Sequence, residues 1–348
     1  MKKWLARLFG GAGGARPASP PDPDAARGVD APARQPASNG VPAGSDPEPV
    51  PDIDLAFFLW LAGPHVSGAP AGAGLILDEL ARLGRDPIDA ASLVPRVPAV
   101  IPQLLRSLRD ADSSAASLAR QVAQDTVLVA EVIREVNSPY YRPTTAVRNL
   151  EGALLLLGQN GLRMLLARVA FRPIISMQAS PLARLVAPSL WRQAEHCALA
   201  ASLLAPRHGA DPFEAYLAGL MHNVGLIVAL RVIDGLLPAG ALPDDDAFGL
   251  GLVRVARQIS ARIATQWELP PPIGHAIAHL ANAAVDTDAD TDADADPLPA
   301  TLGAADRLAK LHMLAGGGQP AFVRAVAQLA PHERRVFEQL HHQQQEAS

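Results

Sequence analysis

The sequence has little cysteine, few aromatic residues and no long hydrophobic run, and each shortage excludes a class of protein. Cys197 is the only cysteine among 348 residues, so an internal disulfide framework and a multi-cysteine metal site are both excluded. The apolar runs fall well short of the roughly 20 residues that a membrane-spanning helix needs. Aromatic residues make up 4% of the chain, and the apolar content is carried by Ala, Leu and Val, which favours helices over strands.

Positively charged residues are too few and too scattered for a typical nucleic-acid-binding protein. The formal net charge is -5, from 30 Lys and Arg against 35 Asp and Glu. The turn at Gly158–Gly161 joins two helical patterns, as a DNA-reading helix-turn-helix does, but the second pattern offers only Arg163 and Arg168 to a groove. We therefore expect no nucleic-acid partner.

The N-terminal residues 1–53 predict a disordered tail with a short amphipathic start. Pro, Ala, Gly, Ser and Asp dominate from Gly10 to about Pro51, and such a stretch buries too little surface to offset its ordering entropy. Arg7 interrupts the apolar run that a signal peptide would need, so we expect a cytoplasmic protein. A weak membrane-surface contact is an alternative, through the apolar face formed by Trp4, Leu5, Leu8 and Phe9.

Helical patterns fill the rest of the chain, and no strand is strongly signalled. We expect an all-α bundle of about ten helices, in which Asp125 caps a helix that ends at Val136 and Asn149 caps the next. The later predicted helices are Pro188–Ala205, Pro212–Leu230, Val253–Trp267, Ile273–Ala284, Thr301–Leu314 and Ala321–His341. The predicted organisation is a tail at 1–53, a helical preface at 54–92, a main domain at 93–314 and a C-terminal extension at 315–348.

An acidic low-complexity insertion interrupts the main domain at residues 286–297. Its alternating aspartates are spaced somewhat as in a calcium-binding loop, but the glycine of the sharp turn and the terminal glutamate of such a loop are both missing. We therefore interpret the insertion as a solvated loop.

The most informative segment is GLMHNVG, at Gly219–Gly225, because a polar His-Asn pair stands within an apolar helical pattern. Other segments accompany it in order: VIREVNSPYY, LEGALLLLGQNGLRMLL, SLWRQAEHCALAA, QWELPPPIGHAIAHL and AADRLAKL. Together they resemble the HDOD domain, a branch of the HD metal-dependent phosphohydrolase superfamily whose usual form of the first segment is GLLHDIG. The resemblance spans about Leu93–Leu314. It implies an HD-like helical bundle and a bacterial signal-transduction role, often through protein partners.

The resemblance also implies where a metal site would lie. Active superfamily members hold one or two divalent ions with a His, a His-Asp pair and a late Asp. Carried over residue by residue, these ligands fall on Gln193, His222, Asn223 and Asp306. Gln193 is not an imidazole, and Asn223 offers a neutral carbonyl in place of a carboxylate. We therefore expect a vestigial pocket without metal or other cofactor, in which His222 and Asn223 join helices by hydrogen bonds.

Two functions follow from this pocket. The first is a non-catalytic regulatory module that acts by binding proteins of unknown identity. The alternative is a metal-dependent phosphohydrolase acting on a nucleotide or cyclic nucleotide, in which His196 completes a site with His222 and Asp306. The motif of cyclic-dinucleotide phosphodiesterases, HHE-x-x-D-G-x-G-Y-P, is absent, and Cys197 is interpreted as an inert core thiol.

Overall fold

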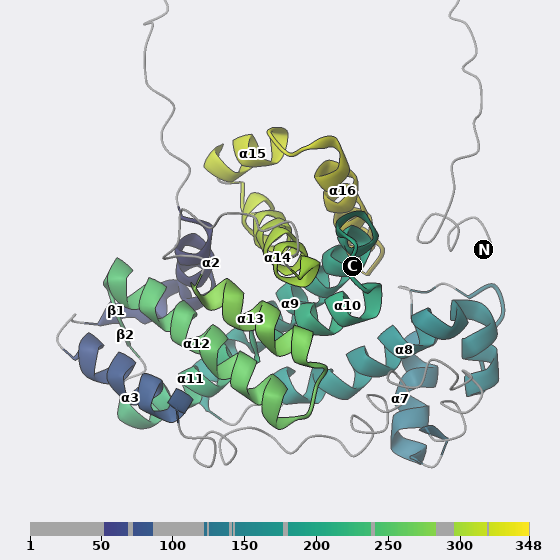
Figure 1. Ribbon diagram of the computed structural model, residues 1–348, viewed down its shortest axis with the longest axis horizontal. Coiled ribbons are helices and arrows are strands. Elements are labelled where there is room, and N and C mark those ends of the chain that lie inside the picture. Colours follow the sequence, from purple (N-terminus) through teal and green to yellow (C-terminus); the bar gives the residue numbers. More distant parts are fainter. Residues whose placement is uncertain are drawn as a thin grey trace, which may run out of the picture. The chain divides into compact units, whose positions relative to one another are not determined.

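The computed structural model describes the compact unit Val50–Ser348, apart from several gaps within it (Figure 1). The described residues are 52–68, 72–85, 122–123, 125–138, 141, 143–176, 180–237, 241–282, 296–318 and 320–347. The predicted tail before residue 52, the amphipathic start and the acidic residues 286–295 lie outside these ranges.

The described part of the chain is almost entirely helical, which confirms the predicted all-α class. The N-terminal elements are α2 (Ile53–Ala62), the 3-10 turn η1 (Gly63–His65), α3 (Ala73–Arg85) and α7 (Thr126–Val136). The central helices are α8 (Leu150–Ser176), α9 (Pro181–His208), α10 (Pro212–Met221), α11 (Val224–Leu236), α12 (Asp246–Gln266) and α13 (Pro271–Asn282). The chain continues with α14 (Pro297–Ala315), α15 (Pro320–Ala327) and α16 (Pro331–Ala347). Two short strands that the sequence did not predict, β1 (Val66–Gly68) and β2 (Leu242–Pro243), pair in parallel.

Polar caps fix several helix starts where the sequence predicts them. The Asp125 side chain accepts hydrogen bonds from the backbone amides of Val127 and Leu128, and Asn149 Oδ1 accepts one from the amide of Gly152. Gly158, with φ of 71°, interrupts the helical geometry within α8. The predicted break at Gly158 is therefore a kink within one long element.

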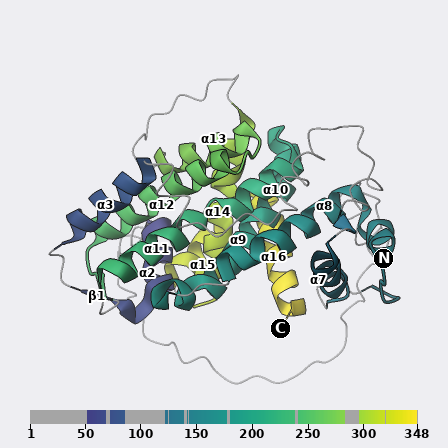
Figure 2. The same cartoon turned by 90° about the horizontal axis from the view of Figure 1, so that it is seen from below.

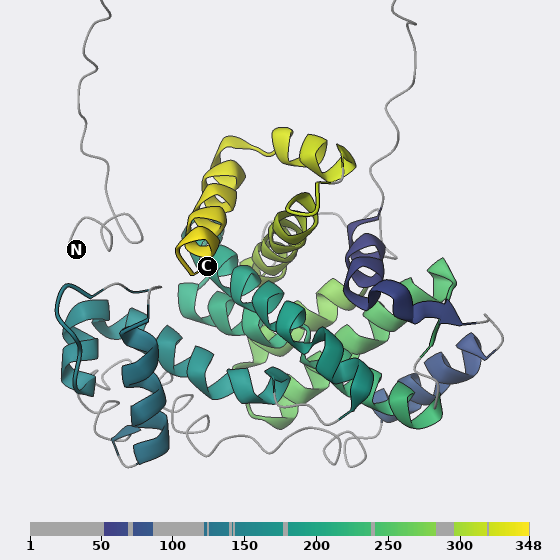
Figure 3. The ribbon, with the colours of Figure 1, turned by 180° about the vertical axis from the view of Figure 1, so that it is seen from behind.

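The core forms where α9 packs against α10 and α14, and where α12 packs against α11 and α13. Figure 3 shows α9, in teal, passing between α8 and the yellow C-terminal helices. The preface helices α2 and α3 both lie against α12, and α3 is seen beside it in Figure 2. Apolar burial on α9 covers nearly its whole length, from Leu182 to Ala205, which explains why this helix is longer than predicted.

The predicted continuous helix Pro212–Leu230 is wrong. Helix α10 ends at Met221 and α11 begins at Val224, so His222 and Asn223 form the turn between two helices. The apolar pattern is continuous across this turn because both helices are buried on nearly all sides. The predicted helix Ala321–His341 is likewise two helices, because Pro331 starts α16 as its first residue.

Two segments are long and apolar enough to cross a membrane, Leu150–Ser176 and Pro212–Leu236. In the second segment 89% of the most apolar window is buried inside the protein, and this segment is divided by the turn after Met221. In the first, 39% is buried and the Gly158 kink interrupts the helix. Because core helices pass the same test of length and composition, these segments are weak evidence for membrane insertion.

Gly225 allows α11 to approach α12 closely, and we expect Gly225→Ala to lower the free energy of unfolding by about 3 kcal/mol. A Cβ at this position would lie 2.0 Å from the Ala256 carbonyl oxygen and 2.7 Å from the backbone nitrogen of Ser260. Urea unfolding measures the effect. Gly235→Ala on the same helix is the matched control, because its Cβ would meet nothing within 4 Å. Equal stability of the two variants would contradict the close packing.

Candidate functional site

The four residues that the resemblance places at a metal site lie together in the core. Gln193 comes from α9, His222 and Asn223 from the turn between α10 and α11, and Asp306 from α14. Gln193 Nε2 donates to Asp306 Oδ1 at 2.8 Å, and Asn223 Nδ2 donates to Gln193 Oε1 at 2.7 Å. All four residues are buried. The two amide side chains that replace the family's His and Asp are therefore hydrogen-bonded to each other.

The His222 ring is held at both nitrogens. Nδ1 lies 2.7 Å from the carbonyl oxygen of Gly219, and this nitrogen is a donor because a carbonyl oxygen only accepts. Nε2 lies 3.1 Å from Asp306 Oδ1 and 3.3 Å from Gln193 Nε2. The ring is completely buried. These contacts link the α10–α11 turn to α9 and α14, so the polar residues join three parts of the fold.

Two cations occupy the other side of the Asp306 carboxylate. Oδ2 accepts from an Arg257 Nη atom at 2.8 Å and from Lys310 Nζ at 2.6 Å. Asp54, on the preface helix α2, accepts from the same two side chains, at 2.7 and 2.9 Å from Arg257 and at 2.6 Å from Lys310. We call Asp54, Arg257, Asp306 and Lys310 the charge cluster. Its two carboxylates and two cations sum to zero formal charge.

The charges of this cluster hold one another in their ionised forms. Burial alone would raise the pKa of Asp306, but attraction to Lys310, His222 and Arg257 holds this pKa well below its usual value. The pKa of Asp54 is lowered in the same way, since attraction to Lys310 and Arg257 outweighs the effect of burial. Burial would lower the pKa of Arg257, but Asp306 and Asp54 raise it. The cluster is therefore a set of mutually neutralised ions, of which Arg257, Asp306 and Lys310 are buried and Asp54 is partly exposed.

Cys197 is a third potential metal ligand beside His222 and Asp306. The ligand atoms of Cys197, His222 and Asp306 lie within 4.8 Å of one another. Cys197 follows Gln193 by four residues and so shares its face of α9. Burial, and to a lesser extent the Asp306 charge, raise the pKa of the Cys197 thiol well above its usual value. A protonated thiol is a poor metal ligand and a poor nucleophile.

The residues present do not fit a divalent metal ion. Both oxygens of Asp306 already accept hydrogen bonds, and two of the donors are the cations Arg257 and Lys310. An ion bound here would have to displace those donors. Because the charge cluster is already neutral, the ion would gain no net attraction to offset the loss of its hydration shell. The ammonium group of Lys310 supplies positive charge at the carboxylate in place of a metal.

His196, the residue proposed above to complete a metal site with His222 and Asp306, packs against His312. Its ring packs edge-on against His312, with ring centroids 4.7 Å apart, and His312 in turn contacts Phe337 and His341 of α16. The group of possible ligands in the described residues contains Cys197 and not His196. The structure thus does not bring His196, His222 and Asp306 together as a ligand set.

Comparison with known proteins identifies the class of this helical domain. The model of the HDOD domain matches residues 94–283, more than half of the chain. The protein therefore belongs to the HDOD family. The matched segment contains three of the four residues at the expected metal site, Gln193, His222 and Asn223, whereas Asp306 lies beyond it.

Three solved structures share the fold. An HDOD domain protein of unknown function from Geobacter sulfurreducens is 20% identical, with a TM-score of 0.53 over 78% of this chain and 95% of its own. A provisionally named signal transduction protein from Marinobacter aquaeolei VT8 is 18% identical, with a TM-score of 0.55 over 82% of this chain and 67% of its own. A provisionally named metal-dependent phosphohydrolase from Shewanella amazonensis SB2B is 18% identical, with a TM-score of 0.52 over 78% of this chain and 99% of its own.

A relative from Treponema pallidum (strain Nichols), which has no assigned function, is 24% identical over 216 residues. The match covers 58% of this chain but 40% of the relative. The chain thus spans about two fifths of that protein's length. At these identities the solved structures establish the fold alone, so the function has to be argued from the site.

Proposed function

We propose that this protein is a non-catalytic regulatory module of bacterial signal transduction, which acts in the cytoplasm by binding other proteins. The proposal rests on the hydrogen-bond partners of the Asp306 carboxylate, which occupy both of its oxygens. Where an active superfamily member would present this carboxylate to a metal ion, Arg257 and Lys310 donate to one of its oxygens while Gln193 and His222 contact the other. The former ligand positions thus act as a structural connection between helices.

Further support comes from the chemistry that the site lacks among the described residues. Metal-assisted hydrolysis needs an ion with an open position for water, and it needs ligands that are free to bind the ion. Asn223 Nδ2 donates to Gln193 Oε1, and burial raises the pKa of the Cys197 thiol. The Marinobacter structure, which is named for signal transduction, agrees with a regulatory role but does not identify a partner.

The second candidate is a metal-dependent phosphohydrolase acting on a nucleotide or cyclic nucleotide. The proximity of Cys197, His222 and Asp306 favours it, as does the name of the Shewanella structure. This function requires Lys310 and Arg257 to leave Asp306, and such a movement would leave buried charges without partners. The non-catalytic module therefore agrees better with the geometry.

Rebuilding the ligand set distinguishes the two functions. We expect no hydrolysis of bis(p-nitrophenyl) phosphate with Mn²⁺ by the wild-type protein or by the Gln193→His, Asn223→Asp double variant, because Lys310 still neutralises Asp306 in both. Addition of Lys310→Met to the double variant should allow Mn²⁺ binding, measured by isothermal titration calorimetry. The contrary result is hydrolysis by the wild-type protein that His222→Ala abolishes.

A further inference from the structure

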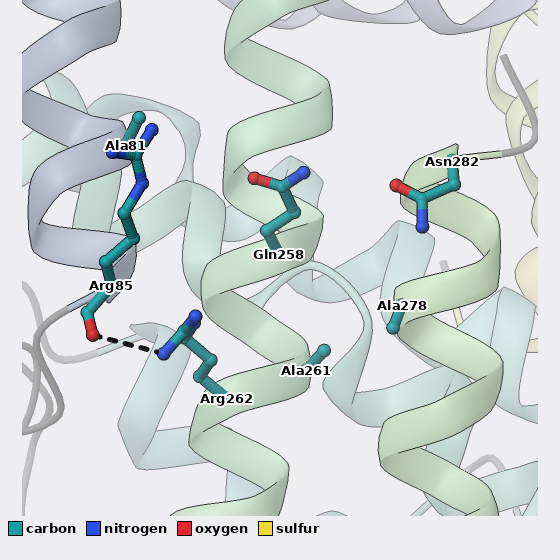
Figure 4. A pocket seen from close by; sticks show the side chains of 7 residues that line it. All are labelled: Ala81, Arg85, Gln258, Ala261, Arg262, Ala278 and Asn282. Carbon is teal, nitrogen blue, oxygen red and sulfur yellow. Dashed lines mark hydrogen bonds between the residues drawn. The ribbon is translucent and has the colours of Figure 1, made fainter. Parts of the chain in front are cut away.

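A second site lies apart from the charge cluster, in a hollow between α3, α12 and α13 (Figure 4). Its volume of about 430 Å³ lies within the usual range of small-molecule sites. Four polar side chains line it, Arg85 from α3, Gln258 and Arg262 from α12 and Asn282 from α13. The floor is formed by Ala81, Ala261 and Ala278. The hollow therefore combines two guanidinium groups and two amides with three alanine methyl groups, one from each helix.

The two arginines carry charge that the described residues do not neutralise. Neither Arg85 nor Arg262 forms an ion pair with a carboxylate in the described part of the chain, whereas Arg168 and Arg257 are each bound by acidic side chains. Arg262 Nη1 donates to the backbone oxygen of Arg85 at 3.3 Å, which places this guanidinium beside the end of α3 (Figure 4). Guanidinium groups match the geometry of phosphate oxygens and bind them through paired hydrogen bonds.

The rest of the hollow suits the organic part of a phosphorylated ligand. The small alanine side chains leave room for a compact group, and Gln258 on α12 and Asn282 on α13 can donate and accept hydrogen bonds (Figure 4). A neighbouring hollow of about 590 Å³ shares Ala261, Arg262 and Ala278 with the first, so a ligand can extend past Arg262. An inorganic ion alone would leave most of this space empty.

We propose that the hollow binds a small phosphate monoester, with the phosphate held by Arg85 and Arg262 and the organic part against the alanine floor. Helix α3 lies before the segment that matches the HDOD domain, so the preface supplies one wall of the site. The site is also close to the charge cluster through α12. Arg257, the neighbour of Gln258, donates to the backbone oxygen of Leu280 on α13 at 3.3 Å. A ligand that draws α3, α12 and α13 together therefore acts on α12, which carries Arg257 of the charge cluster, and on α13, whose backbone Arg257 contacts.

Direct binding to the full chain tests the proposal independently of the proposed function, because the measurement involves neither catalysis nor a protein partner. The probes are adenosine 5′-monophosphate, glycerol 3-phosphate and glucose 6-phosphate, titrated calorimetrically at constant ionic strength, with adenosine, glycerol and glucose as unphosphorylated counterparts. The variants are Arg85→Gln and Arg262→Gln. Arg324→Gln, at an exposed position of α15, is the control with the same change of charge.

We expect at least one monoester to bind while its unphosphorylated counterpart does not. Loss of either pocket arginine should weaken this binding about tenfold or more, since a hydrogen bond between charged groups is removed. Arg324→Gln should bind like the wild-type protein. Two results would overturn the proposal. One is that none of the three monoesters binds the wild-type protein at millimolar concentration, and the other is that both pocket variants bind as tightly as the wild type.

Discussion

Asp306→Asn is expected to lower the free energy of unfolding by about 3–5 kcal/mol, because it leaves the two buried cations with Asp54 as their one remaining counter-charge in the cluster. Asp306 accepts from Arg257 and Lys310, and both cations are almost completely buried. An asparagine could still accept from Gln193 through its oxygen, but its amide nitrogen would then face the two cationic donors. Urea unfolding at neutral pH measures the loss.

A double-mutant cycle separates the charge effect from the change of shape. Lys310→Met alone leaves a negative excess in the cluster, whereas Asp306→Asn combined with Lys310→Met restores its formal neutrality. We expect the double variant to be more stable than the sum of the single effects predicts, by about 2 kcal/mol. Glu79→Gln, which breaks an exposed ion pair with Arg82, should leave stability nearly unchanged because solvent screens this pair. Simple additivity of the Asp306 and Lys310 effects would show that the cluster is not electrostatically coupled.

The second large effect is a loss of stability in mild acid, which we attribute to two buried histidines. Burial is the main cause that lowers the pKa of His196 to about 3 and that of His312 to about 4. Above about pH 6.5 both residues are neutral whether the protein is folded or unfolded. As the pH falls below that value, the unfolded chain binds protons that the folded protein excludes. Stability should therefore fall by about 1.4 kcal/mol per pH unit for each histidine until the folded pKa is reached.

Other groups add to this slope or oppose it. The pKa of His208 is lowered, mainly by burial, so this residue adds to the loss of stability in acid. His341 lowers the pKa of His312, and His312 and Arg192 lower that of His196. The Asp54 and Asp306 contributions, present above about pH 4, are lost only at lower pH because the folded pKa of each is lowered. The raised pKa of buried Glu195 acts in the opposite sense, since it favours the folded state as the pH falls.

Substitution of one histidine tests the assignment. His312→Phe, whose ring can pack against Phe337, should reduce the pH dependence of the unfolding free energy between pH 6.5 and 4.5 by about half. His279→Gln, at an exposed position of α13, should leave it unchanged. Denaturant unfolding at several pH values gives the slope for each protein. An unchanged slope in His312→Phe would assign the acid sensitivity to other groups.

The sequence predicts the fold class and the helix caps well because both depend on local chemistry. Asp125 and Asn149 are followed by helical apolar patterns, and the structure shows both as caps. The turn at His222 and Asn223 could not be predicted from periodicity, since the residues on both sides of it are apolar and buried. The space around Gly225, which depends on a helix far along the chain, is invisible in the local pattern.

The candidate site was predictable only in part. Its four family positions follow from motif order, and the spacing of four residues could have added Lys310 to Asp306 and Cys197 to Gln193. No local pattern connects Asp54 with Arg257, because 203 residues separate them and the contact arises from the packing of α2 against α12. The resemblance could thus indicate which ligands were lost, but it could not show which charges had replaced the metal.

The central claim is that buried cations occupy the place of a metal ion at Asp306. Its most direct test is the metal content of the full chain, purified without chelators from cells supplied with iron and manganese and measured by mass spectrometry. Because Arg257 and Lys310 already neutralise the carboxylates, we predict well under one equivalent of any transition metal. Stoichiometric iron or manganese that is lost in His222→Ala would contradict this account.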